Sequence, residues 1–290
     1  MNEDPHVTGQ PRGDAGRPDP ASGESTRGET ARGDADIAEA ARLFAEPARA
    51  RILVALADGR ALPASMLASE AGVSPATASS HLRHLLRAGL VVVEPTGRHR
   101  YYRLAGPDVA AVLESLAQVA PTQPVRSLRQ ATRAQALRAA RTCYDHLAGR
   151  LGVALTSALV EHGALTRIEA GTDRLRGDDR SGPVRNHPYV LGPKAAEVLG
   201  DLGVDLDALR DPTSGDPRSL NRSRSRRPLL RFCTDWTERR HHLAGRLGAA
   251  LAASLFEREW VVRRPHQRAV RLTDRGADGL RRTLGLTVDV

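Results

Sequence analysis

Apolar residues recur at helical spacing in the first part of the chain, between residues 37 and 120. Ile37, Ala40 and Leu43 fall on one face of a first helix. Pro47 opens a second helix, because proline is tolerated in a first helical turn. Three more helices are predicted to begin at Pro63, Pro75 and Asp108.

The fourth of these helices has an apolar side and a polar side. Leu82, Leu85 and Leu86 share one face and are predicted to anchor the helix to its neighbours. Ser74 is a natural N-cap for this helix, and Pro75 follows at its first position. The other side carries hydroxyl and imidazole groups that can donate and accept hydrogen bonds, namely Thr77, Ser80, His81 and His84.

A two-stranded hairpin is predicted after Gly89. Its strands are the β-prone runs 91–93 and 101–104, and the turn between them is Pro95-Thr96-Gly97. Three basic residues lie just after the tip, Arg98, His99 and Arg100. This order of helices and hairpin is typical of a winged helix-turn-helix.

Residues 37–119 resemble the ArsR-type bacterial repressors. The resemblance rests on three segments, EPARARILVALADG (46–59), GVSPATASSHLRHLLRAGLV (72–91) and TGRHRYYRL (96–104). Several separated signals agree: the proline–arginine start, the S-x-x-x-x-S-x-H-L core of the fourth helix, the A-G-L-V exit, and a Gly-Arg wing ending in tyrosine. The resemblance implies a transcriptional repressor that acts on double-stranded DNA as a homodimer.

A helix-turn-helix protein places its second helix in the major groove, and basic wing residues reach phosphates or the minor groove. We therefore expect DNA contacts from Ser74, Thr77, Ser79, Ser80, His81, Arg83, His84, Arg87, Arg98, His99 and Arg100. The resemblance also implies a dimer interface between the first and fifth helices, at Leu43, Phe44, Val112, Leu113 and Leu116. The two recognition helices of such a dimer lie roughly 34–36 Å apart, about one turn of DNA.

Many members of this family release DNA when a metal binds near the third helix or on the fifth. Here the segment LPASMLASEAG contains no cysteine, and the fifth helix offers only Asp108 and Glu114. Neither set has the thiolate and imidazole donors that a tight transition-metal site requires. Metal sensing is therefore not predicted for the winged helix.

Composition favours an anionic partner and a cytoplasmic setting. The 290 residues are 40% hydrophobic but only 3% aromatic, so the cores must be built from Leu, Ala and Val. A formal charge of +9 favours nucleic acid, although a generally basic proteome is the alternative explanation. The two cysteines, together with the lack of a signal peptide or a membrane-length apolar run, indicate a cytoplasmic protein without membrane contact.

An internal repeat occupies the second half of the chain. HLAGRLGVALTSAL (146–159) and HLAGRLGAALAASL (242–255) are identical at ten of fourteen positions, with an offset of 96 residues. β-prone residues and a matching helix follow each copy, which predicts two half-units packed with approximate twofold symmetry. Polar loops are expected at 171–188 and 211–228, and SLRQATRAQALRAARTCYDHLAG (127–149) is predicted to be one helix with a basic face.

The repeat contains both cysteines and a pair of equivalent histidines. Cys143, His146, Cys233 and His242 are candidates for a zinc site or a thiol switch. The spacing is loose, however, and the cysteines are not equivalent under the repeat. We therefore expect buried structural cysteines and ordinary core or capping histidines, and we predict no metal and no cofactor.

These patterns predict a mainly α protein with small β wings, an α+β fold. Residues 1–35 form a disordered tail, 36–120 the winged helix-turn-helix, and 121–290 a duplicated helical C-terminal domain with short hairpins, in half-units of about 125–205 and 228–290. The predicted function is a repressor whose C-terminal domain regulates it or stabilises the dimer, with an effector of unknown identity.

The alternatives are a metal- or thiol-responsive regulator, an enzyme fused to a DNA-binding domain, and an interaction scaffold that no longer binds DNA. No phosphate loop, nucleophile elbow or paired metal motif indicates an enzyme.

Overall fold

A computed structural model describes residues 34–121, 124, 127–168, 188–210, 227–264 and 267–289. The predicted tail and the two predicted polar loops fall almost entirely outside these ranges. None of the described helices has both the length and the apolar character needed to cross a bilayer.

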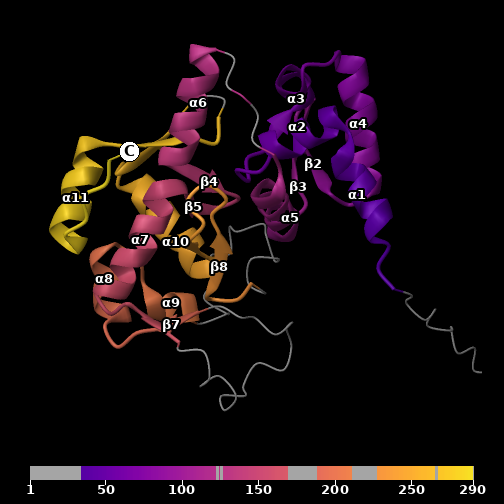
Figure 1. Cartoon of the computed structure of the whole chain (residues 1–290). Helices are drawn as coiled ribbons and strands as arrows, with labels where there is room; N and C mark the ends of the chain where they lie inside the picture. Colours follow the sequence, from indigo (N-terminus) through magenta and orange to yellow (C-terminus); the bar gives the residue numbers. More distant parts are fainter. Residues whose placement is uncertain are drawn as a thin grey trace, which may run out of the picture. The chain divides into compact units, whose positions relative to one another are not determined.

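The first part of the chain folds as the predicted winged helix-turn-helix (Figure 1). Its helices are α1 (Ile37–Ala45), α2 (Pro47–Ala55), α3 (Ala64–Ala71), α4 (Pro75–Arg87) and α5 (Pro107–Val119). Its strands are β1 (Leu62–Pro63), β2 (Val91–Thr96) and β3 (His99–Leu104), in the antiparallel order β1-β3-β2. The short strand β1 was not predicted, since two residues carry no periodic signal.

The hairpin turn lies two residues later than predicted. Pro95 and Thr96 belong to β2, where they pair with Arg100 and His99, and the turn is made at Gly97 with a φ of +59°. The prediction treated proline as a turn residue. Because β2 is an edge strand, its proline does not have to donate a ladder hydrogen bond.

The remaining elements form two series with the same order of hairpin, helix, hairpin and helix (Figure 1). After α6 (Leu128–Ala139), the first series is β4 (Arg141–Cys143), β5 (His146–Ala148), α7 (Gly149–Glu161), β6 (Leu165–Arg167), β7 (Tyr189–Leu191) and α8 (Ala195–Asp201), with α9 (Leu206–Arg210) following it. The second series is β8 (Arg231–Thr234), β9 (His241–Ala244), α10 (Gly245–Glu257), β10 (Val261–Arg263), β11 (Val270–Leu272) and α11 (Asp274–Leu284).

The prediction of a single helix over residues 127–149 is wrong. Helix α6 ends at Ala139, and Ala140 is extended, with φ −156° and ψ 135°. The backbone instead forms strand hydrogen bonds with the second series: Val270 N donates to Ala140 O at 3.0 Å, and Thr142 N donates to Arg268 O at 3.0 Å. Arg141, expected on an exposed basic face, is completely buried. Tertiary pairing has therefore overridden local helix propensity.

The central helix of each series packs against the first hairpin of the other series. Helix α7 packs against β9 of the second series, and α10 packs against β5 of the first. A side chain at Gly152 would place its Cβ 2.4 Å from Leu147 O, and one at Gly248 would place its Cβ 2.5 Å from Leu243 O. Neither glycine can therefore be replaced by a larger residue unless the preceding strand moves.

Two separate apolar cores result. One is built from α2–α5 and the hairpin, with Ile52, Leu82 and Leu104 at most 1% exposed. The other spans both series, from Ala140 to Leu284, and includes Leu151 and Leu247 from the two central helices. Leucine, alanine and valine dominate both cores, as the low aromatic content predicted.

Candidate nucleic-acid interface and buried cysteine–histidine cluster

Helix α4 is fixed in place by its cap and its leucines. The hydroxyl oxygen of Ser74 accepts the amide of Thr77 at 3.2 Å, which confirms the predicted N-cap. Leu82 and Leu85 are buried against the helices that precede α4. Pro75 has no amide hydrogen and Thr77 is capped, so the first turn still offers the amide of Ala76 and the positive end of the helix dipole, which attract phosphate.

The opposite side of α4 is polar and largely open to solvent. Ser74, Thr77, Ser79, Arg83, His84 and Arg87 are exposed, whereas Ser80 and His81 are half-buried. His84 Nδ1 lies 2.9 Å from Ser80 O, one helical turn earlier. This contact orients the imidazole ring and leaves Nε2 free to face a groove.

His81 lies against the start of α2. Its Nδ1 is 3.6 Å from Glu46 Oε2, and Glu46 caps α2 by accepting the amides of Ala48 at 3.1 Å and Arg49 at 2.7 Å. Burial alone would raise the pKa of the Glu46 carboxyl, but these two amides and the neighbouring His81 lower it. Glu46 was not predicted as a cap, because glutamate is not among the usual capping residues and only Pro47 marks the start of α2 in the sequence.

The wing presents the predicted basic tip. Arg98, His99 and Arg100 are all exposed, while Arg103, further along β3, is paired with Glu94 across the hairpin. The guanidinium groups at the tip are therefore exposed to solvent at the end of the hydrogen-bonded β2–β3 hairpin. Such groups can contact phosphates without carrying sequence information.

An exposed polar recognition helix, anchored by buried leucines and followed by a basic wing, defines the class of winged helix-turn-helix DNA-binding proteins. Residues 44–94 match a family described as helix-turn-helix domain. The uncharacterized HTH-type transcriptional regulator YdfF of Bacillus subtilis is 38% identical over 253 residues, which cover 87% of this chain and 99% of YdfF. The chain belongs to the family of HTH-type transcriptional regulators, and the predicted ArsR-type winged helix with a C-terminal extension is confirmed.

Two solved structures are similar to the winged-helix part. The cadmium metal-sensor CMTR from Mycobacterium tuberculosis is 39% identical, and the match covers 32% of this chain and all of that one, with a TM-score of 0.26. The homodimeric winged helix-turn-helix DNA-binding domain of Mb0332 from Mycobacterium bovis, a possible ArsR-family regulator, is 36% identical. That match covers 29% of this chain and 75% of the domain, again with a TM-score of 0.26.

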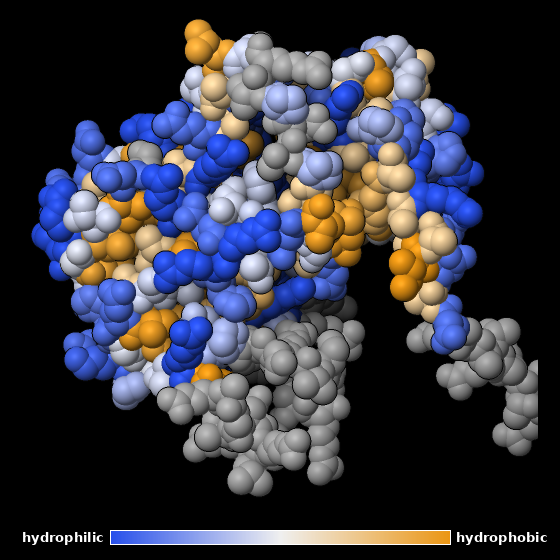
Figure 2. Space-filling view, in the orientation of Figure 1, coloured by the Kyte–Doolittle hydropathy of each residue, from blue (hydrophilic) through white to orange (hydrophobic). Residues whose placement is uncertain are grey.

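The residues predicted for dimerisation fall into two groups. Val112 and Leu116 of α5 are exposed, each at 43%, and Figure 2 shows apolar surface over this helix. Leu43, Phe44 and Leu113 are half-buried, and the last two of these also pack on the winged-helix core. Helix α1 contributes no buried residue, although its apolar positions share one face.

The four candidate cysteine and histidine residues converge on one point. Cys143 pairs directly with His146 across the β4–β5 hairpin, and Cys233 pairs directly with His242 across β8–β9. Potential ligand atoms of all four residues lie within 4.8 Å of one another. The prediction that the cysteines are not equivalent under the repeat is wrong, because they occupy the same register position in the two hairpins.

A buried ion-pair network lies beside this cluster. The guanidinium of Arg141 donates to Asp235 Oδ2 at 3.0 Å and to Glu114 Oε2, on α5, at 3.2 Å. Arg268 also reaches Glu114, at 3.3 Å. Burial opposes ionisation of Asp235, but Arg141 and the other donors around it bring its pKa to about 2. This network could not be predicted from the sequence, because its members come from distant segments.

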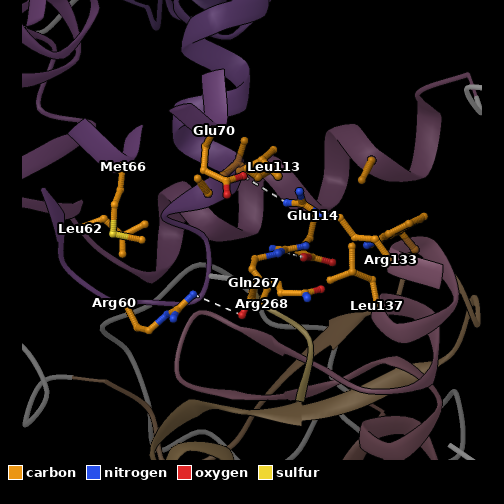
Figure 3. Close-up of a pocket in the computed structure, with 14 residues that line it drawn as sticks. Arg60, Leu62, Met66, Glu70, Leu113, Glu114, Arg133, Leu137, Gln267 and Arg268 are labelled. Carbon is orange, nitrogen blue, oxygen red and sulfur yellow. Dashed lines mark hydrogen bonds and ion pairs between the residues drawn. The ribbon is translucent and has the colours of Figure 1, made fainter. Parts of the chain in front are cut away.

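A cavity of about 180 Å³ lies next to Glu114 (Figure 3). Ion pairs border it, Glu70–Arg133 and Glu114–Arg268, and Arg60 donates to Gln267 O at 3.2 Å. Binding pockets for drug-sized ligands are larger, roughly 300–1,000 Å³. The cavity therefore suits only a very small molecule.

Proposed function

We propose that this protein is a sequence-specific transcriptional repressor that binds double-stranded DNA as a homodimer in the cytoplasm, and that it is not an enzyme. The observation that carries the proposal is that α4 has one buried apolar face and one exposed polar face. Its leucine face is locked into the core, while Thr77, Ser79 and His84 are held in solvent on a capped, rigid helix. A helix with these properties reads base edges from the major groove.

The remaining contacts follow from charge and exposure. Arg83 and Arg87 flank the polar face of α4 and are placed to reach phosphates, as are Arg98, His99 and Arg100 at the wing. Ser80 and His81 contribute less than predicted, since both are half-buried and His81 lies against Glu46. Ser74 acts chiefly as the cap of the helix.

A second copy of the chain is proposed to cover α1 and α5. Val112 and Leu116 are exposed on the same face of α5, one turn apart, with Val119 (80% exposed) near them at its end. Residues of this kind on neighbouring turns favour helix-to-helix contact between two protomers. Two recognition helices then address a roughly palindromic operator.

The C-terminal part is proposed to be a separate regulatory or dimer-stabilising domain, beginning near residue 121. It contacts the winged helix through Arg141, which pairs with Glu114, and through Tyr144, whose amide donates to Ala57 O at 2.7 Å. A change in the C-terminal part can therefore reach α2 and α5 directly. An effector of unknown identity would act through these contacts.

Genome-wide mapping of bound sites, followed by anisotropy titration of the recovered duplexes, tests the DNA-binding function. Ser79→Ala/His84→Ala should lose most of the preference for the recovered sites, because each well-placed base contact contributes roughly 1–3 kcal/mol of discrimination. Arg275→Ala, at an exposed position of α11, is the control for surface changes and should bind as the wild type does. Equal affinity of all three proteins for the sites, or no preferred duplex, would contradict the proposal.

A further inference from the structure

The cysteine–histidine cluster brings together four donors of the kind that bind transition metals. Cys143, His146 and His242 are at most 3% exposed, and Cys233 is half-buried. The donors come as two cross-strand pairs, one from each series of the repeat. Two thiols and two imidazoles constitute a complete ligand set for a tetrahedral structural site.

The histidine nitrogens are not satisfied by the surrounding protein. Nε2 of His146 and both ring nitrogens of His242 are buried, with no hydrogen-bond partner among the described residues. A buried polar group without a partner costs free energy on the order of 1–3 kcal/mol. Two histidines in equivalent positions share this cost, and a ligand bound between them would remove it.

An acidic side chain lies near Nδ1 of each histidine. His146 Nδ1 lies 3.4 Å from Asp145 Oδ1, and His242 Nδ1 lies 3.6 Å from Asp235 Oδ2. Both Nε2 atoms are thereby left for a metal. Metal-binding histidines usually direct their second nitrogen at a carboxylate, which fixes the ring and raises its basicity.

Other roles for the cluster explain only part of it. The two rings stack with centroids 5.1 Å apart and an angle of 29°, but stacking leaves the nitrogens unsatisfied. A disulfide between Cys143 and Cys233 would consume the thiols and likewise leave both Nε2 atoms without a hydrogen-bond partner or ligand. A metal ion engages all four donors at once.

We propose that Cys143, His146, Cys233 and His242 bind one divalent metal ion of the zinc class, with tetrahedral coordination by two thiolates and two imidazoles. Two thiolates neutralise a divalent charge, which makes the ion compatible with a buried position. Zinc–nitrogen and zinc–sulfur bonds of about 2.0–2.3 Å place ligand atoms roughly 3.3–3.8 Å apart. The cluster must therefore contract by only about 1 Å from its widest separation of 4.8 Å.

The site joins the two halves of the repeat and lies next to the winged helix. Its ligands belong to two hairpins that are distant in the sequence, so the metal acts as a cross-link. All four coordination positions are filled by protein, which is typical of structural rather than catalytic zinc. Tyr144 follows Cys143 directly and its amide donates to Ala57 O, so the metal also holds the contact between the β4–β5 hairpin and the turn after α2.

Cobalt titration of the full-length protein tests the site. The reduced chain, stripped with a chelator, should take up one Co²⁺ per chain, with thiolate charge-transfer bands and the intense visible bands of tetrahedral cobalt, and Zn²⁺ should displace it. His242→Gln should abolish these bands, whereas His241→Gln, at the neighbouring residue outside the cluster, should retain them. Asp145→Asn should weaken Co²⁺ binding by about 10–100-fold while keeping the tetrahedral spectrum.

A second measurement needs no variant and therefore does not depend on a mutant folding. Stoichiometric Zn²⁺ should slow the alkylation of the half-buried Cys233 in the wild-type chain, and Mg²⁺ should not. Three outcomes would overturn the proposal: no stoichiometric uptake by the reduced chain, octahedral cobalt without thiolate bands, or a Cys143–Cys233 disulfide that forms in air and excludes the metal. Operator binding is measured separately, by anisotropy titration of the same protein samples, so failure here is distinguishable from failure of the proposed function.

Discussion

The guanidinium of Arg141 lies 3.0 Å from the carboxylate of Asp235, and both side chains are completely shielded from solvent. These residues belong to different halves of the repeat, and the same guanidinium reaches Glu114 of α5. Asp235 also accepts the amide of Gly149, at the start of α7, at 2.6 Å. One ion-pair network thus ties both hairpins, a central helix and the winged helix together.

Arg141→Met should strongly destabilise the protein. The substitution leaves two buried carboxylates, Asp235 and Glu114, short of their principal counter-charge, and breaking a buried pair in this way costs about 3–5 kcal/mol. The free energy of unfolding by denaturant measures the effect. Arg281→Met removes an exposed pair with Asp278 and should cost less than about 1 kcal/mol. Similar losses in the two variants would contradict a central role for the buried network.

The recognition helix and the wing should respond differently to mutation. Arg98→Ala should weaken binding to all duplexes by a similar factor and reduce the salt dependence by about one counterion, because it removes a phosphate contact. His84→Ala should instead change the order of preference among duplexes. Binding titrations over several salt concentrations, with operator variants, separate the two. Identical effects would show that the groove assignment is wrong.

Leu116→Glu should convert the proposed dimer to a monomer and weaken operator binding. A charge at this exposed position of α5 cannot be buried against a second copy without a large desolvation cost. Leu128→Glu is the matched control, since Leu128 is 88% exposed but lies on α6. Sedimentation analysis should detect the change in mass for the first variant alone. A wild-type monomer bound to its operator would refute the interface.

Gly152→Ala should destabilise the repeat by about 1–3 kcal/mol, since overpacking forces the backbone apart. Its new Cβ would lie 2.4 Å from the carbonyl oxygen of Leu147 and 3.6 Å from His242 Cβ. The control is Gly200→Ala in α8, where a Cβ meets nothing within 4 Å. That variant should be more stable than the wild type by about 0.5–1 kcal/mol, because alanine favours a helix. Thermal or denaturant unfolding should show a lower free energy of unfolding for Gly152→Ala and a higher one for Gly200→Ala than for the wild type.

Acid should weaken the cap at the start of α2. The pKa of Glu46 is lowered in the folded state, so its contribution to stability is present above the unfolded value of 4.5 and is lost as the pH falls through the lower folded value. Glu46→Gln should therefore reduce stability at neutral pH and approach the wild type in acid. Glu197→Gln, at an exposed position of α8, should keep the wild-type pH profile. Parallel pH profiles for Glu46→Gln and the wild type would contradict this assignment.

Local signals in the sequence were enough to define the winged helix. Ser74 and Pro75 start α4, Gly72 adopts a left-handed φ of +68° between α3 and α4, and the leucine spacing identifies the buried face. These features are set by interactions between residues close together in the chain, so capping residues and hydrophobic periodicity predict them. The placement of Pro95 in a turn failed because whether a strand lies at an edge is not a local property.

The cysteine–histidine cluster required the tertiary structure. Residues 144–145 separate Cys143 from His146, whereas residues 234–241 separate Cys233 from His242, so a fixed offset of 96 aligns the histidines and misaligns the cysteines. Aligning hairpins with loops of unequal length would have revealed the match.

The sequence by itself determined a DNA-binding helix, its wing and a duplicated C-terminal half. Only the tertiary structure decided that Arg141 is buried in a strand and that the cysteines face each other across the repeat. The reason is that strands as short as β4 and β8 have too few residues for a periodic pattern. Their register is set by partners that lie far away in the chain.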